Sequence, residues 1–201
     1  MIKVDIEYPQ GTTRLDPDEI EGLKFKHVMT REQLDHLEQA NIEQGLIWLR
    51  RCRNKDILNE GFVKELHKRL FGEVWVWAGT FRRTEKNIGI DPLQIAVELR
   101  NLLDDARFWT ENNTYSPPEA AIRFHHRLVY IHLFPNGNGR HARIMADIML
   151  TEIFNCEPAD WARGYNFQAM GDRRKLYIQA LREADKGDFK MLLQFVSKHS
   201  T

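Results

Sequence analysis

The chain has 201 residues, with 29 Lys and Arg against 29 Asp and Glu, so its formal net charge at pH 7 is zero. This length suits one domain with a substantial core and is short for two. The balanced charge gives no electrostatic reason to expect nucleic acid or an anionic membrane as a partner. No apolar run reaches the roughly 20 residues that cross a bilayer. Cys52 and Cys156 match neither a C-x-x-C motif nor a disulfide-rich secreted domain, which favours a reducing cytoplasm.

Hydrophobic periodicity and turn residues predict a mainly α protein. Residues 2–6 alternate apolar and polar side chains, which indicates a short strand or extended arm. The segment DEIEG predicts a brief helical turn that ends at Gly22. Thr30 and Gln33 form a capping-box pattern, and a helix with apolar residues at helical spacing should follow to Leu49. Further helices are expected over 62–71, 93–109, 118–133, 140–154 and 172–185, with Gly187 as a stop signal.

One segment departs from the helical pattern. In VWVWAGTFRRTEKNIGI, Val and Trp alternate and glycines occupy positions 79 and 89, which predicts a β-hairpin over 80–90. Arg82 and Arg83 within it are expected to be solvated charges, as are Arg173 and Arg174. No repeat or linker marks a boundary, so we expect one compact domain, with an N-terminal arm and helices over 1–61 and a core over 62–196.

The stretch HLFPNGNGRHAR contains the strongest candidate for chemistry. PNGNG is the whole connection between two predicted helices, so its backbone N–H groups can converge on one point. Gly137 and Gly139 can adopt positive φ, and the first turn of the next helix adds unpaired N–H groups and the positive end of its dipole. The sequence therefore predicts an anion cradle, although many Gly-Asn-Gly loops do nothing but turn.

Charged and titratable residues flank this loop. Arg140 and Arg143 are three residues apart, hence on one face of the first helical turn, where two guanidinium groups suit a polyphosphate. His132, at the end of the preceding helix, is placed to accept a proton from a hydroxyl that attacks the bound phosphate. His125 and His126 are about 9 to 10 Å from His132 along a helix, too far to share a metal ion.

The stretch resembles the signature of the Fic family, H-x-F-x-(D/E)-G-N-G-R-x-x-R. The likeness extends over roughly 62–196 and implies a Fic-type helical bundle with one small β-hairpin flap. The N-terminal LDPDE and EQANI segments are also similar to the mobile mystery protein B subfamily, which implies a bacterial, toxin-antitoxin-like setting and a helix-turn-helix neighbour protein. The matching signature positions are His132, Phe134, Gly137, Asn138, Gly139, Arg140 and Arg143.

The resemblance implies protein adenylyltransferase activity (AMPylation). His132 would remove the proton from a Ser, Thr or Tyr hydroxyl of a target protein, and the oxygen would attack the α-phosphorus of ATP and expel pyrophosphate. The loop residues Gly137, Asn138 and Gly139 would hold the α- and β-phosphates, and Arg140 and Arg143 the β- and γ-phosphates. Phe134 would anchor the loop in the core. The flap that docks the target by β-augmentation would comprise Thr84, Glu85, Lys86, Asn87, Ile88 and Gly89.

One signature position differs. Asn136 stands where the family has the acidic residue that holds Mg²⁺, and a neutral ligand should weaken capture of Mg²⁺ or Mn²⁺. Alternatives therefore stay open: transfer of UMP, phosphocholine or phosphate on the same scaffold, or a non-catalytic module that binds a nucleotide or a partner.

Many Fic proteins inhibit themselves through a [S/T]-x-x-x-E-(G/N) helix whose glutamate pairs with the second arginine of the signature. The nearest segment here is PDEIEG, in which Glu21 and Gly22 fit and Pro17 replaces the Ser or Thr. The resemblance predicts that Glu21 pairs with Arg143; the alternative is a surface glutamate in an acidic turn.

Overall fold

The computed structural model describes residues 16–27, 30–53, 55–161 and 171–197, so the strand expected at 2–6 lies outside the described residues. The described part is mainly α and contains no sheet, only one isolated bridge between Leu23 and Trp75. Its elements are α1 (Pro17–Glu21), α2 (Arg31–Arg51), α3 (Glu60–Phe71), the 3₁₀ turn η1 (Pro92–Gln94), α4 (Ile95–Glu111), α5 (Pro117–Ile131), α6 (Asn138–Ile148), the π-helical turn η2 (Met149–Ile153), α7 (Gly171–Asp185) and α8 (Lys190–Val196). The predicted helices are confirmed, and α8 was not expected.

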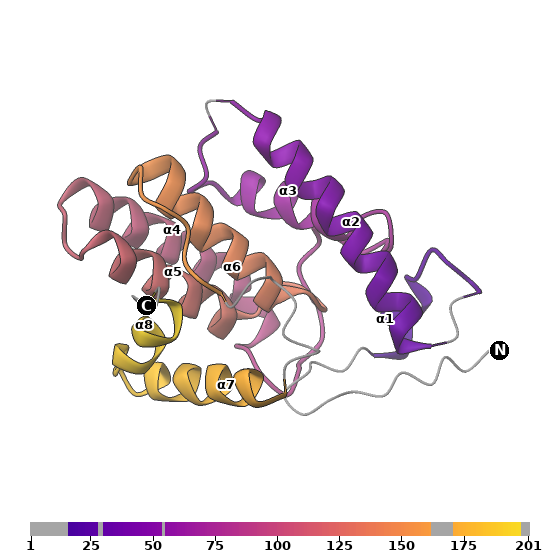
Figure 1. Cartoon of the computed structure of the whole chain (residues 1–201). Coiled ribbons are helices and arrows are strands. Elements are labelled where there is room, and N and C mark those ends of the chain that lie inside the picture. Colours follow the sequence, from indigo (N-terminus) through magenta and orange to yellow (C-terminus); the bar gives the residue numbers. More distant parts are fainter. Residues whose placement is uncertain (1–15, 28–29, 54, 162–170, 198–201) are drawn as a thin grey trace.

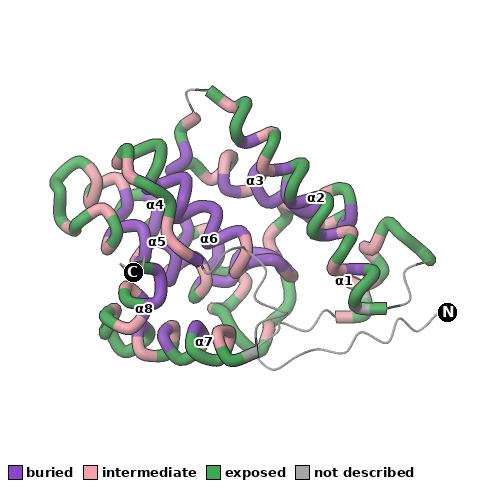
Figure 2. The backbone as a smooth tube through the Cα atoms, in the orientation of Figure 1, coloured by how far each residue is buried: buried purple, intermediate pink, exposed green. Residues whose placement is uncertain are grey.

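Helices α5 and α6 form the centre of the bundle (Figure 1). Helix α4 packs beside α5, α3 contacts both α4 and α6, and α2 lies along α3. At the other end α8 contacts α5, and α7 packs on α8. Buried residues concentrate in α3, α5 and α6 (Figure 2). The connection between the two central helices is therefore held by packing on several sides.

Local sequence explains where these helices begin and end. Thr30 caps α2 as expected: its hydroxyl accepts from the Gln33 amide at 3.3 Å, and the Gln33 side chain accepts from the Thr30 amide at the same distance. Pro117 and Pro118 open α5, where a missing N–H costs nothing. Helix α5 ends because His132 adopts a left-handed conformation, with φ of 57°. That residue turns the chain into the PNGNG loop.

The predicted β-hairpin over 80–90 is wrong in its strands, because this segment is an irregular loop. Arg82, expected to be solvated, is buried inside the loop and its guanidinium donates to the carbonyl oxygens of Thr84 and Ile90. These carbonyls are thereby bonded to a side chain instead of to a facing strand.

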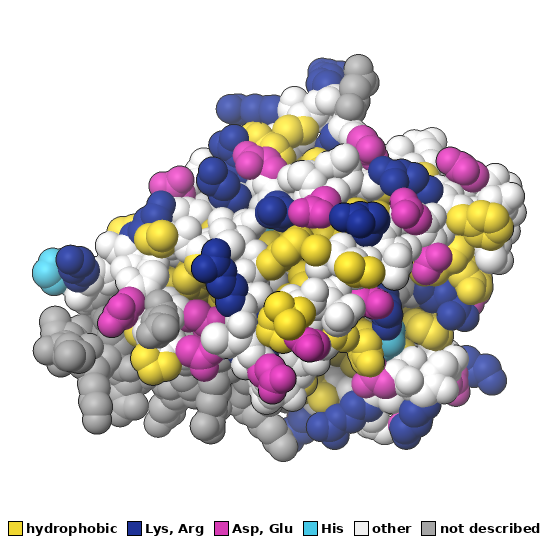
Figure 3. All heavy atoms as spheres, turned by 180° about the vertical axis from the view of Figure 1, so that it is seen from behind, with side chains coloured by type: hydrophobic (Ala, Val, Ile, Leu, Met, Phe, Trp, Pro, Cys, Tyr) yellow, Lys and Arg dark blue, Asp and Glu magenta, His cyan; other side chains and the backbone are white. Residues whose placement is uncertain are grey.

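The surface carries both charge signs. Lys and Arg side chains alternate with Asp and Glu over the face shown in Figure 3, with apolar side chains between them. No helix in the described ranges has both the length and the apolar character needed to span a membrane. Cys52 and Cys156 form no disulfide.

Candidate active site

His132 occupies the junction between α5 and the loop and is only 3% exposed. Burial lowers the pKa of its imidazole to about 3, and the nearby charges of Arg82 and Lys86 act in the same direction. The imidazole is therefore neutral at neutral pH, the state in which a histidine can accept a proton.

The glycines of the loop differ in conformation. Gly137 has φ of 78° and is the N-cap of α6, and a Cβ atom there would lie 2.7 Å from the Phe71 ring. Only glycine fits this position. Gly139 lies within the first turn of α6 and does not adopt the positive φ that we expected. The α6 N-terminus nevertheless presents its first backbone N–H groups at the end of the loop.

The side chain of Asn138 closes the loop on itself. Its Oδ1 atom accepts from the Phe134 amide at 2.9 Å, and its Nδ2 atom donates to the Phe134 carbonyl at 2.7 Å. Phe134 is fully buried, as expected of a core anchor, and stacks on His67 with ring centroids 3.7 Å apart. Both ends of the Asn138 amide are thus engaged in holding the loop.

His67 is a loop-supporting residue that sequence reasoning missed. Its Nδ1 atom accepts from the Gly79 amide at 3.0 Å, so its Nε2 atom carries the proton and donates to the Asn136 carbonyl at 3.1 Å. Burial keeps the pKa of this imidazole well below its usual value. A helical histidine 69 residues before Asn136 offers no pattern by which sequence alone could identify the contact.

Arg140 and Arg143 extend from α6 toward different helices. Arg140 forms an ion pair with Glu38 of α2 at 2.7 Å and lies over the Phe71 ring. Arg143 is 4% exposed and hydrogen-bonds Tyr177 of α7. Burial lowers the pKa of Arg143, and Tyr177 opposes that effect. The two arginines thus share a helix but do not converge on one point in this conformation.

Glu21 is not on Arg143. It is exposed at the end of α1 and makes no ion pair among the described residues, whereas Glu38 is the carboxylate that contacts a signature arginine. Helix α1 docks elsewhere because Leu23 forms a bridge with Trp75 and the Trp77 indole donates to the Glu19 carbonyl at 2.9 Å. These contacts hold the short helix beside the segment that follows α3.

The predicted flap residues Thr84–Gly89 lie between α1 and His132. The Lys86 side chain is 3% exposed and pairs with Asp16 at 2.8 Å and with Glu19. The Thr84 hydroxyl donates to Asp16 at 2.6 Å, and these hydrogen bonds from Lys86 and Thr84 lower the pKa of that carboxyl. At the other end, a Cβ atom on Gly89 would lie 2.6 Å from the His132 Cβ. The flap segment therefore rests directly against the histidine.

The residues around Asn136 do not build a Mg²⁺ site by themselves. The Asn136 Oδ1 atom accepts from the Gly137 amide at 2.7 Å. Within the described ranges no group of three or more His, Cys, Asp or Glu residues could hold a metal ion. His125 forms a hydrogen bond with Tyr177 and His126 with Asp185, each at 2.9 Å.

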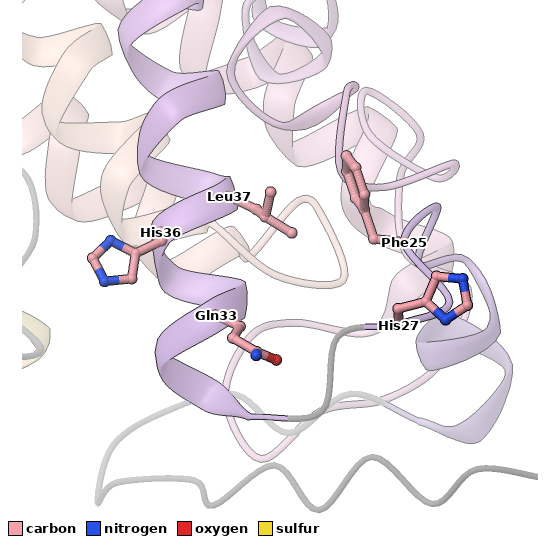
Figure 4. A pocket seen from close by; sticks show the side chains of 5 residues that line it. All are labelled: Phe25, His27, Gln33, His36 and Leu37. Carbon is pink, nitrogen blue, oxygen red and sulfur yellow. The ribbon is translucent and has the colours of Figure 1, made fainter.

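A separate pocket of about 450 Å³ lies near the start of α2 (Figure 4). Leu37 points from α2 toward Phe25 across this space. The other lining residues are His27, Gln33 and His36. None of the candidate catalytic residues contributes to it.

Proteins of known sequence are similar to this chain. The chain is 27% identical over 179 residues to protein adenylyltransferase fic-1 of Caenorhabditis elegans, covering 83% of this chain and 32% of that protein. It is 29% identical over 148 residues to protein adenylyltransferase Fic of Drosophila grimshawi, covering 71% and 27%. The chain thus spans about a third or less of the length of these curated relatives.

Solved structures give the same fold. Fic-1 (residues 134–508) from C. elegans aligns with a TM-score of 0.67 at 23% identity, covering 90% of this chain and 52% of that one. BepC from Bartonella tribocorum, solved with bound AMPPNP, aligns with a TM-score of 0.68 at 16% identity, covering 90% and 96%. Residues 57–150, from the approach to α3 through α6, match the model of the Fic/DOC family. Residues 57–150 of the chain are therefore similar in sequence to the Fic/DOC family, and the chain shares the fold of these solved Fic structures.

Proposed function

We propose that this chain is a protein adenylyltransferase, which moves AMP from ATP to a Ser, Thr or Tyr hydroxyl of a target protein. The observation that carries the proposal is the neutral His132 at the end of α5, between the flap and the N-terminus of α6. The names of the relatives support the reaction, and AMPPNP in BepC supports ATP as donor.

In the proposed reaction His132 accepts the proton of the target hydroxyl. The oxygen then bonds to the α-phosphorus of ATP, the bond from that phosphorus to the bridging oxygen breaks, and pyrophosphate leaves. The N–H groups at the start of α6, around Gly137 and Gly139, would stabilise the charge on the transferred phosphate. Arg143 would bind the terminal phosphates, and Arg140 could do so only by leaving Glu38.

The dependence on Mg²⁺ or Mn²⁺ belongs to the same proposal. With Asn136 engaged by Gly137, the phosphates of ATP are the main ligands that remain for the ion. The roles proposed for His132, the α6 N-terminus and the two arginines do not depend on the metal.

Labelling with different donors tests the proposal. Transfer from α-labelled ATP but not from γ-labelled ATP is expected for the parent chain. His132→Ala should abolish labelling while ATP affinity changes little, because the imidazole acts on the hydroxyl and not on the phosphates. His36→Ala, an exposed histidine, is the control and should label normally.

Other outcomes select the alternatives. Labelling from γ-labelled ATP, UTP or a phosphocholine donor would assign a different transferred group. No labelling with any donor would indicate a binding module.

The remaining expectations from sequence are part of the proposal. They are a bacterial cytoplasmic setting, membership of the mobile mystery protein B subfamily, a toxin-antitoxin role and a helix-turn-helix partner. The division into an N-terminal region over 1–61 and a core over 62–196 is also proposed. The family match over 57–150 begins shortly before that core and otherwise lies within it.

A further inference from the structure

Arg82 bonds the end of the helix that carries the candidate base. Its backbone amide donates to the Leu133 carbonyl at 2.9 Å. Its Nε atom donates to the His132 carbonyl at 2.6 Å, and its Nη2 atom to the Ile131 carbonyl at 3.3 Å. One arginine thus satisfies three consecutive carbonyl groups at the C-terminus of α5, where helical partners are missing.

The same guanidinium holds both ends of the flap. Its Nη1 atom donates to the Thr84 carbonyl at 2.9 Å, and its Nη2 atom donates to the Ile90 carbonyl. These two carbonyls bracket the segment that passes Gly89 against His132. The flap and the end of the helix that carries His132 are therefore held by the same guanidinium group.

Arginine is the side chain whose chemistry fits this place. Its planar guanidinium offers five N–H donors in fixed directions, whereas a lysine ammonium offers three from one atom. A positive charge at a helix C-terminus also interacts favourably with the helix dipole. Arg82 is 2% exposed, and burial lowers its pKa, an effect that Asp91, Glu19 and Glu85 oppose.

We propose that Arg82 is a positioning residue that fixes His132 and the flap in one geometry, so that a target segment docked on the flap presents its hydroxyl to the imidazole. The catalytic consequence rests on the proposed function. The placement of His132 and the flap by Arg82 does not.

The test compares Arg82→Lys and Arg82→Met with Arg83→Lys, which changes the neighbouring exposed arginine. In the nucleotide-free full chain, amide hydrogen exchange over 84–90 should accelerate in both Arg82 variants and stay unchanged in Arg83→Lys. Arg82→Met should also raise the pKa of His132, followed by NMR, because a nearby positive charge is removed. Arg82→Lys keeps the charge, so its pKa effect should be smaller.

Kinetics separate positioning from general destabilisation. Arg82→Lys should lower the kcat of AMP transfer about 100-fold, the scale of a small misplacement of a base, with the Kd for ATP within about twofold of the parent. Circular dichroism checks that each variant is folded. Folded variants with parental flap exchange and parental His132 pKa would overturn the proposal. If the parent transfers no AMP, the proposed function fails, and the exchange and pKa measurements still decide the role of Arg82.

Discussion

At the scale of single residues, Asn136 shows how one side chain changes the chemistry expected of a loop. An aspartate at this position would bring a carboxylate to the phosphates, but the amide here accepts from the adjacent Gly137 N–H. A neutral oxygen is a weaker ligand for Mg²⁺ than a carboxylate. We therefore expect metal binding, more than ATP binding, to limit the rate.

Asn136→Asp should lower the Mg²⁺ concentration for half-maximal AMP transfer by about tenfold and raise turnover, since it adds a charged ligand beside the phosphates. A Mg²⁺ titration of the labelling rate measures this. Asn59→Asp is the control: it adds the same charge at the N-cap of α3, where aspartate is well tolerated. An unchanged Mg²⁺ dependence in Asn136→Asp would place the metal away from this residue.

At the scale of elements, α1 contacts the flap, whereas the expected inhibitory helix would contact Arg143. Lys86 is buried and its charge is balanced by Asp16 and Glu19. Because a buried charge that loses a partner is costly, α1 should stabilise the flap in its position against His132. Under the proposed function, helix α1 would then act on target docking and would leave the arginines of α6 untouched.

Glu19→Gln should reduce the free energy of unfolding by about 1 to 3 kcal/mol, since it weakens the pairing of a buried ammonium. It should also accelerate limited proteolysis within residues 84–89. Glu21→Gln changes the exposed glutamate of the same helix and should match the parent in urea unfolding, in proteolysis and in labelling. Higher labelling in Glu21→Gln would restore the self-inhibition hypothesis that the geometry does not support.

At the scale of the whole molecule, four of the buried histidines make the fold sensitive to acid. Burial lowers the pKa of His67, His125, His132 and His141, to about 3 for His132 and about 4 for His141. In the unfolded chain these histidines bind protons near pH 6.5, whereas in the folded chain they bind protons only at much lower pH. Stability is therefore complete above about pH 6.5 and declines as the pH falls toward the folded values.

When the pH is lowered from 7 to 5, the free energy of unfolding should fall by about 2 kcal/mol for each of His132 and His141. Urea unfolding at several pH values measures the slope. His141→Gln, which can still donate to the Val63 carbonyl, should flatten the slope, and His36→Gln should not. A pH-independent free energy of unfolding would show that the buried histidines are accessible to protons in the folded chain.

Local sequence determined the helices and the loop of this protein. The capping box at Thr30, the prolines at the start of α5 and the glycine at position 137 act through neighbouring residues, so periodicity and turn chemistry located them. The signature from His132 to Arg143 could also be identified from sequence, because the helix end, the loop and the helix start that form it are contiguous in the chain. Short C-terminal helix α8 was missed because its apolar residues give too few turns to establish a period.

Only tertiary structure decided how those elements use their charged residues. The sequence predicts Arg82 to be a surface charge. The residue is buried because the carbonyls at the end of α5, about 50 residues later, accept hydrogen bonds from it. Arg140 is paired with Glu38, and Glu21 stays exposed, because α2 and α1 dock against different parts of the molecule. Such contacts join residues distant in the chain, and their partners are fixed by packing of whole helices, which no local pattern encodes.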